Sequence, residues 1–172
     1  YPCATEPGQS LTEAVTYTAT SRPRTVTHEP LSVLGRRYSL ELPPNQNPRT
    51  LALATRLQAG APDTASYARA VLDYFVQKGF EYTLTPPKLT GNAVDEFLFS
   101  TRRGFCGHYA SAFATLMRAG GVPARVVTGY LGGEWNPVGQ YLLVKQSDAH
   151  AWVEIWVGGR GWVRVDPTGV VA

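Results

Sequence analysis

The sequence has few cysteines and no long apolar run. Only 2 of its 172 residues are cysteine, too few for the disulfide framework of a small secreted domain. No apolar stretch approaches the roughly 20 residues that a membrane helix needs. No signal peptide is visible at the start of the sequence, and the abrupt opening at Tyr1-Pro2-Cys3 leads us to expect a processed or excised chain.

Excess charge is small as well. The formal net charge is +3, and the Lys and Arg residues are scattered rather than gathered into a basic stripe with interleaved aromatics. Nucleic acid is therefore not an expected partner. The composition, 44% hydrophobic and 17% charged, is ordinary for a globular protein. The length suits one domain with a real core.

Residues 1–48 differ in pattern from the rest. Residues 11–21 (LTEAVTYTATS) and 36–44 (RRYSLELPP) carry Thr, Val and Tyr with partial alternation, which predicts strands. We predict that residues 1–48 form a β or irregular segment, either a sheet edge or the remnant of a neighbouring domain. Residues 49–172 then form the main core.

Helical patterns fill the first part of this core. Residues 48–60 have a proline near the start and a terminal glycine, and residues 62–80 repeat apolar side chains every fourth position. The segment after Cys106 has the same kind of apolar stripe and stops at Gly120-Gly121. We also expect a short extended piece at 80–87 and one or two helical turns at 94–100.

Beyond Pro123 the apolar period changes to two. The pattern predicts four strands with turns at 132–139 and 158–161, and the strands are expected at 124–131, 140–146, 150–157 and 161–168. Helices followed by an antiparallel sheet predict an α+β fold.

Two of these strands bring a histidine and a carboxylate to one side of the sheet. In residues 150–157 the apolar side chains alternate with His150 and its neighbours, so the two sets face opposite ways. Matching the apolar faces requires a loop with an odd number of residues, three or five. A register that sets Thr168 opposite His150 makes Asp166 its diagonal neighbour, within reach of a side-chain hydrogen bond.

Cys106 stands between glycines at the start of a predicted helix. The positive end of the helix dipole and the free amides there favour a thiolate, and Gly104 and Gly107 leave room for a substrate backbone. The alternative is a small buried cysteine that packs as an apolar residue. A cysteine nucleophile needs an imidazole and an orienting carboxylate, so Cys106, His150 and Asp166 together favour catalysis.

Three segments resemble the core motifs of the transglutaminase-like superfamily, in the family's order. They are GFCGHYASAFATLMRAGGVPARVVTGY, SDAHAWVEIWV and GWVRVDPT, and the resemblance covers about residues 64–168. The chain is most similar to the periplasmic core of bacterial inner-membrane transglutaminase-like proteins of the Pseudomonas type. This implies a papain-like α+β core, a periplasmic location and a parent protein anchored in the membrane.

The resemblance implies roles for the three residues. Cys106 is the nucleophile, His150 the general base and then acid, and Asp166 the orienting carboxylate. The thiolate attacks a carboxamide such as a glutamine side chain, and the thioester passes to an amine or to water, as in a protein-glutamine gamma-glutamyltransferase. The partners implied are a protein, peptide or cell-wall acyl donor and an amine acceptor, with no cofactor. Tyr82 is the candidate second oxyanion donor beside the Cys106 amide, or else an ordinary strand tyrosine.

Three further residues are candidates for the substrate cleft. Trp152 is expected as a cleft wall, or else it covers the sheet under the helix together with Trp156 and Trp162. Trp135, in a predicted turn, is either an exposed lip or a loop anchor. His108 is expected to line the cleft or point to solvent. A zinc site at His108 is disfavoured, because structural zinc sites use more cysteines, and no metal is expected.

Two other functions stay open. A cysteine peptidase or amidase acting on peptide or cell-wall amides uses the same residues with water as the acceptor. A non-catalytic peptide-binding module is the second alternative.

Overall fold

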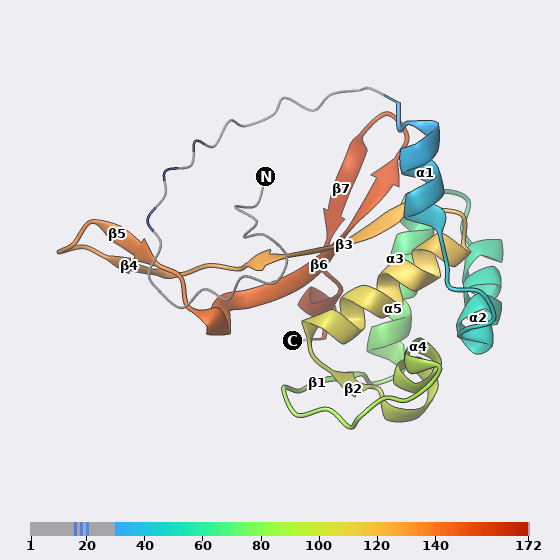
Figure 1. Ribbon diagram of the computed structural model, residues 1–172. Coiled ribbons are helices and arrows are strands. Elements are labelled where there is room, and N and C mark those ends of the chain that lie inside the picture. The colour runs from blue at the N-terminus through green and yellow to red at the C-terminus, as the bar shows by residue number, and fades with distance from the viewer. Residues whose placement is uncertain (1–15, 17, 19, 21–29, 172) are drawn as a thin grey trace.

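Helices pack against one face of a three-stranded antiparallel sheet (Figure 1). The computed structural model describes residues 16, 18, 20 and 30–171. Helices and two short strands come first, in the order α1 (Val33–Leu40), α2 (Pro48–Ala59), α3 (Thr64–Gln77), β1 (Glu81–Tyr82), α4 (Ala93–Glu96), a π-helical turn (Phe97–Thr101), β2 (Arg103–Gly104) and α5 (Cys106–Ala119). None of these described helices has the length and apolar character to span a membrane.

The predicted helices at 48–60 and 62–80 are confirmed as α2 and α3. Pro48 occupies the first turn of α2, where its missing N–H costs nothing. The Asp63 side chain caps α3 by accepting the Ser66 N–H at 2.7 Å. The apolar stripe of α3 is buried as the period of four predicts, and Tyr67 from that stripe donates its hydroxyl to the Leu116 carbonyl of α5 at 2.6 Å.

Helix α5 is the centre of the core. Its buried stripe includes Phe113 and Met117, which belong to one cluster with Ala151, Val153 and Ile155 of the sheet. The side chains of these three sheet residues alternate along one strand, so they form the apolar face that the sequence predicts. Burial of this face is the main contact that fixes α5 on the sheet.

The sheet consists of β3 (Ala124–Tyr130), β6 (Ala149–Val157) and β7 (Gly161–Val165), with β6 in the middle. Val157 pairs with Gly161, so the loop holds three residues and the predicted odd loop length is confirmed. The pairing ends at Val153 and Val165. Thr168 therefore leaves the sheet and lies in the 3₁₀ turn Pro167–Val170, although the predicted register is kept up to that point.

The strand prediction for residues 36–44 is wrong, because α1 covers most of that segment. The Ser32 side chain caps the helix by accepting the Gly35 N–H at 3.0 Å, and no residue of α1 is buried. An exposed helix carries no apolar stripe, so partial alternation was a misleading signal. The predicted strand at 11–21 lies outside the described residues except for positions 16, 18 and 20.

The prediction of four strands in one sheet is also wrong. The segment expected as a turn contains β4 (Glu134–Asn136), which pairs with β5 (Tyr141–Leu143) in a separate hairpin. The turn is shorter than predicted and includes Gln140 in a left-handed conformation with φ 55°. Figure 1 shows this hairpin projecting beyond the three-stranded sheet.

Candidate active site

A parallel pair of short strands places Tyr82 beside the start of α5. Tyr82 of β1 is the register partner of Gly104 of β2, and the Thr83 N–H donates to the Gly104 carbonyl at 2.8 Å. Two residues further on, α5 begins at Cys106. The cysteine is a free thiol, half-buried at the edge of the core.

The pKa of Tyr82 is affected by residues from two other parts of the site. Burial raises this pKa, and the charges of Cys106 and Asp166 raise it further. The backbone and the side chain of Cys106 also influence this pKa, which places Tyr82 near the start of α5. Tyr82, the start of α5 and the Asp166 carboxylate therefore share one neighbourhood.

Strands β6 and β7 bring His150 and Asp166 together. Nε2 of His150 lies 2.7 Å from Oδ2 of Asp166, and the two side chains are only 11% and 24% exposed. Figure 1 shows the turn that follows β7 beside the start of α5, and that turn packs on α5. When Nε2 donates its proton to the carboxylate, the lone pair of the neutral ring lies on Nδ1.

Thr168 holds the other carboxylate oxygen. Oδ1 of Asp166 accepts the Thr168 N–H at 3.1 Å and its hydroxyl at 2.7 Å. Burial alone raises the pKa of Asp166, but the hydrogen bonds from Thr168 and His150 outweigh it and lower the pKa below its ordinary value of 3.8. Thr168 was not among the predicted site residues. Its position two residues after an aspartate is the signal of an Asx turn.

Trp152 lies against His150. The two rings stack with centroids 6.3 Å apart and an interplanar angle of 23°, and the Arg164 guanidinium lies 4.3 Å above the indole. A Cβ on Gly129 would come within 2.8 Å of the indole ring. The glycine inside β3 is therefore needed for this close approach, which is what a glycine in a strand pattern can indicate.

The expectation that the tryptophans lie under the helix is wrong. Because α5 packs on the face of Ala151 and Val153, the tryptophans face the other way. Trp156 and Trp162 contact each other edge to face at 5.5 Å, and the Arg125 guanidinium lies 4.2 Å above Trp162. Arginine planes cover these indoles instead of a helix.

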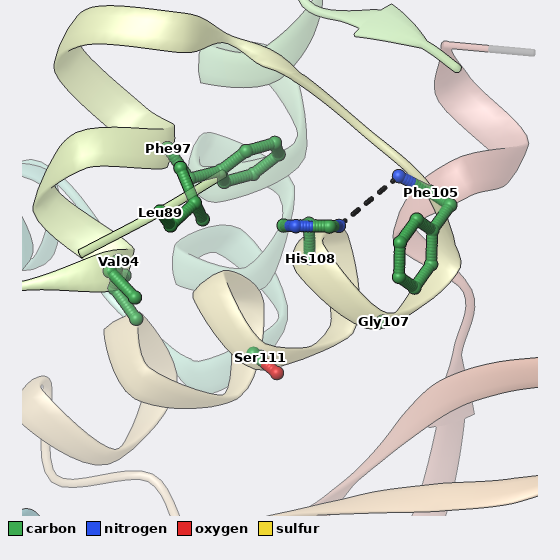
Figure 2. A pocket seen from close by; sticks show the side chains of 8 residues that line it. Leu89, Val94, Phe97, Phe105, Gly107, His108 and Ser111 are labelled. Atoms are coloured by element: carbon green, nitrogen blue, oxygen red, sulfur yellow. Dashed lines mark hydrogen bonds between the residues drawn. The ribbon is translucent and has the colours of Figure 1, made fainter. Parts of the chain in front are cut away.

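His108 lies on the outer side of α5. Two positions along a helix turn by about 200°, so His108 points away from the side of Cys106. Its Nδ1 accepts the Phe105 N–H at 3.3 Å, and Figure 2 shows the imidazole between Phe97 and the ring of Phe105. The imidazole lines a cavity of about 370 Å³, whose walls are Leu89, Ala93, Val94, Phe97, Phe105, Gly107, His108 and Ser111.

The environment of His108 explains one of the glycines. A Cβ on Gly104 would lie 2.7 Å from the Cβ of His108, so this buried glycine makes room for the histidine rather than for a substrate. Burial lowers the pKa of His108, which favours the neutral ring. Within the described part of the chain, no three His, Cys, Asp or Glu side chains are grouped so as to hold a metal ion.

Trp135 does not lie in a turn. It is a residue of β4 in the projecting hairpin and is 58% exposed. Its contact with a substrate stays a prediction.

A cysteine at the start of a central helix, with a hydrogen-bonded histidine and aspartate from the adjoining sheet, defines a papain-like α+β protein. The particular family follows from comparison of the sequence. Residues 51–167 match the transglutaminase-like superfamily, and the chain belongs to that family. The predicted resemblance is thereby confirmed.

Two relatives show how much of a longer protein this chain represents. It is 46% identical over 164 residues to the protein-glutamine gamma-glutamyltransferase of Pseudomonas aeruginosa, and the match covers 95% of this chain and 25% of the relative. It is 36% identical to the uncharacterized protein YebA of Bacillus subtilis, with 75% of this chain and 18% of the relative covered. The chain thus spans a quarter or less of these relatives.

Solved structures also match most of this chain. The periplasmic domain of TgpA from P. aeruginosa, bound to ethylmercury, matches with a TM-score of 0.80 and 51% identity, over 82% of this chain and 51% of that one. A putative cysteine protease from Cytophaga hutchinsonii matches with a TM-score of 0.52 and 27% identity, over 72% of this chain and 38% of that one. These matches confirm the predicted α+β core.

Proposed function

We propose that this chain is the catalytic domain of a cysteine-dependent acyltransferase that uses a glutamine-type carboxamide as its acyl donor. The observation that carries the proposal is the 2.7 Å hydrogen bond between His150 and Asp166. Cys106, at the start of α5, is the proposed thiol for this pair. The name of the P. aeruginosa relative, protein-glutamine gamma-glutamyltransferase, supports the choice of donor.

In the first step His150 takes the thiol proton of Cys106 on Nδ1, because Nε2 is engaged by Asp166. The sulfur attacks the carboxamide carbon, and the carbonyl electron pair moves to the oxygen. Negative charge on that oxygen requires donors already in place. The Cys106 N–H and the Tyr82 hydroxyl are the proposed donors, since β1 places Tyr82 beside the strand that leads into Cys106.

In the second step the tetrahedral intermediate collapses. The carbon–nitrogen bond breaks, the proton on His150 passes to the leaving nitrogen, and ammonia departs. The acyl group remains on Cys106 as a thioester. An amine then attacks the thioester carbon while His150 accepts its proton, and the proton returns to the departing sulfur of Cys106.

Hydrolysis is the second candidate function. Water replaces the amine in the last step and the same three residues act. The similarity to a putative cysteine protease from C. hutchinsonii favours this candidate. The donor is then a peptide or cell-wall amide.

We also propose a periplasmic location. The support is the likeness to the periplasmic domain of TgpA. A parent protein anchored in the inner membrane, with a protein, peptide or cell-wall donor and an amine acceptor as partners, belongs to the same proposal.

The test supplies a glutamine peptide and a primary amine to the chain and follows both products by mass spectrometry. Amine incorporation supports acyl transfer, and acid product alone supports hydrolysis. Cys106→Ala should form neither product and should keep the circular dichroism spectrum of the parent chain. Turnover that survives Cys106→Ala would remove the cysteine from the mechanism.

A further inference from the structure

A second cavity, of about 790 Å³, lies on another part of the surface. Its walls come from α2, from the end of α3 and from the π-helical turn before β2. None of its lining residues belongs to the candidate active site. It therefore needs an explanation of its own.

The polar wall of this cavity is strongly basic. Arg49, Arg56, Lys78 and Arg102 line it, and no carboxylate does. Across the described residues, none of these four cations has an ion-pair partner, because every salt bridge found involves other residues. Four like charges around one hollow repel each other unless an anion joins them.

Two of the cations are held in place rather than free in solvent. The Arg49 guanidinium lies 4.2 Å above the Phe99 ring. Arg102 donates from Nη1 to the Lys78 carbonyl at 3.3 Å. Their order lowers the entropy cost of binding an anion.

The Arg102 guanidinium also has a donor that no described residue uses. Its left-handed backbone, with φ 51°, has a separate cause, because Arg102 caps the end of the π-helical turn. Its Nε is buried and has no hydrogen-bond partner. Buried donors in proteins normally have an acceptor, so this Nε is available to an anionic group in the cavity.

Three of the arginines that line the cavity affect the same tyrosine, Tyr74. Burial raises the pKa of Tyr74, and the charges of Arg102, Arg56 and Arg49 act against that rise. Tyr74 lines the cavity together with these three arginines. Planar guanidinium groups bind phosphate through paired N–H donors.

The remaining wall is apolar and includes Leu53, Leu57 and Phe99. A volume of about 790 Å³ is in the range of sites for whole small molecules. A bare phosphate would leave most of this space empty and the apolar wall uncovered. The cavity thus fits a ligand with an anionic head and an apolar body.

We propose that this cavity binds the phosphate headgroup of an anionic lipid. The arginines hold the phosphate, and the first part of the lipid body covers the apolar wall beside Leu57 and Phe99. The binding uses none of the residues of the proposed chemistry. It brings the domain to a surface that displays phosphate.

Calorimetric titration of the 172-residue chain with monomeric dihexanoyl phosphatidic acid tests the proposal. We expect binding that weakens as salt is added, with weaker or no binding of dihexanoyl phosphatidylcholine and of inorganic phosphate. The double variant Arg49→Gln/Arg56→Gln should weaken phosphatidic acid binding by about tenfold or more. Arg160→Gln, in the exposed turn between β6 and β7, is the matched control and should change it by less than about twofold.

Four outcomes would overturn the proposal. They are no binding of phosphatidic acid, equal binding of phosphatidylcholine, an equal loss in Arg160→Gln, and unchanged binding in the double variant. Binding of inorganic phosphate as tight as that of phosphatidic acid would assign the cavity to a free phosphate ligand instead. Cys106→Ala should bind as the parent chain does, so failure here says nothing against the proposed acyl transfer.

Discussion

Asp166 holds His150 through one carboxylate oxygen and Thr168 through the other. In Asp166→Asn an amide replaces the acceptor for Nε2, so the ring can carry its proton on Nδ1 and lose its function as a base. We expect the rate of thioester formation to fall by roughly 10³-fold or more. Single-turnover mass spectrometry with a glutamine peptide measures this rate.

The exposed Asp73 of α3 offers a matched control for this change. Asp73→Asn should leave thioester formation within about twofold of the parent chain. A rate near the parent value in Asp166→Asn would mean that the carboxylate does not orient the histidine.

The lowered pKa of Asp166 also predicts a dependence of stability on pH. Because the folded pKa lies below the unfolded value, the carboxylate stabilises the fold above about pH 4, and this stabilisation is lost as the pH falls through the folded pKa. The difference in unfolding free energy between the parent chain and Asp166→Asn should therefore shrink in acid. Urea unfolding at neutral pH and near pH 3 measures it, and a constant difference would contradict the assignment.

Tyr82 allows a test of the oxyanion donors. Tyr82→Phe removes one hydroxyl that the Cys106 neighbourhood contains, and we expect turnover to fall by about 10²-fold. Alkylation of Cys106 by iodoacetamide forms no oxyanion, so its rate should change much less. Tyr130→Phe, at an exposed tyrosine, is the control. An equal loss in both assays would mean that Tyr82 acts on the thiol and not on the intermediate.

The residue pattern alone predicted the pairing of His150 with Asp166, whereas Tyr82 was expected beside Cys106 only from the family resemblance. The alternation of apolar side chains fixes which residues of β6 and β7 share a face. The alternation therefore predicts that His150 and Asp166 lie on the same side of the sheet. Tyr82 reaches Cys106 through the parallel pairing of β1 with β2. A pairing of two residues per strand leaves no periodic pattern, and the local sequence therefore could not predict it.

At the scale of elements, the buried Asp95 joins α4 to the start of α2. Its carboxylate accepts the backbone N–H groups of Arg49 at 3.0 Å and Thr50 at 2.7 Å. Asp95→Ala leaves these donors without an acceptor, and we expect a loss of about 2–4 kcal/mol in unfolding free energy. Urea unfolding measures the loss, and Asp73→Ala should cost less than about 0.5 kcal/mol. If both variants lost the same small amount of unfolding free energy, water would be satisfying the backbone N–H groups that Asp95 accepts.

The elements that the sequence predicted are those with a buried stripe. Helices α3 and α5 repeat apolar side chains at the helical period because one side of each faces the core. Helix α1 buries nothing and gave no such signal. Strand β4 is only three residues long and lies between Gly133 and Pro137, which are typical of a turn.

At the scale of the whole molecule, the predicted boundary after residue 48 stays open to test. Helix α1 contributes no buried side chain. The residue after it, Glu41, contacts α5 through an exposed hydrogen bond in which its carbonyl accepts from Arg118 at 2.9 Å. A chain that begins at Glu41 should therefore fold, with a melting temperature lower by no more than about 4 °C, the shift that ~1 kcal/mol produces in a domain of this size. Differential scanning calorimetry measures this, and loss of the cooperative transition would move the boundary toward the N-terminus.

The two layers of the fold divide the proposed chemistry between them. The thiol and the phenol come from the helical side, whereas the imidazole and its carboxylate come from the sheet. A chain in which these halves have not yet docked holds a sulfur without its base. On the proposed mechanism, a nascent or misassembled copy is therefore unable to crosslink the proteins around it, and reactivity begins only with the finished fold.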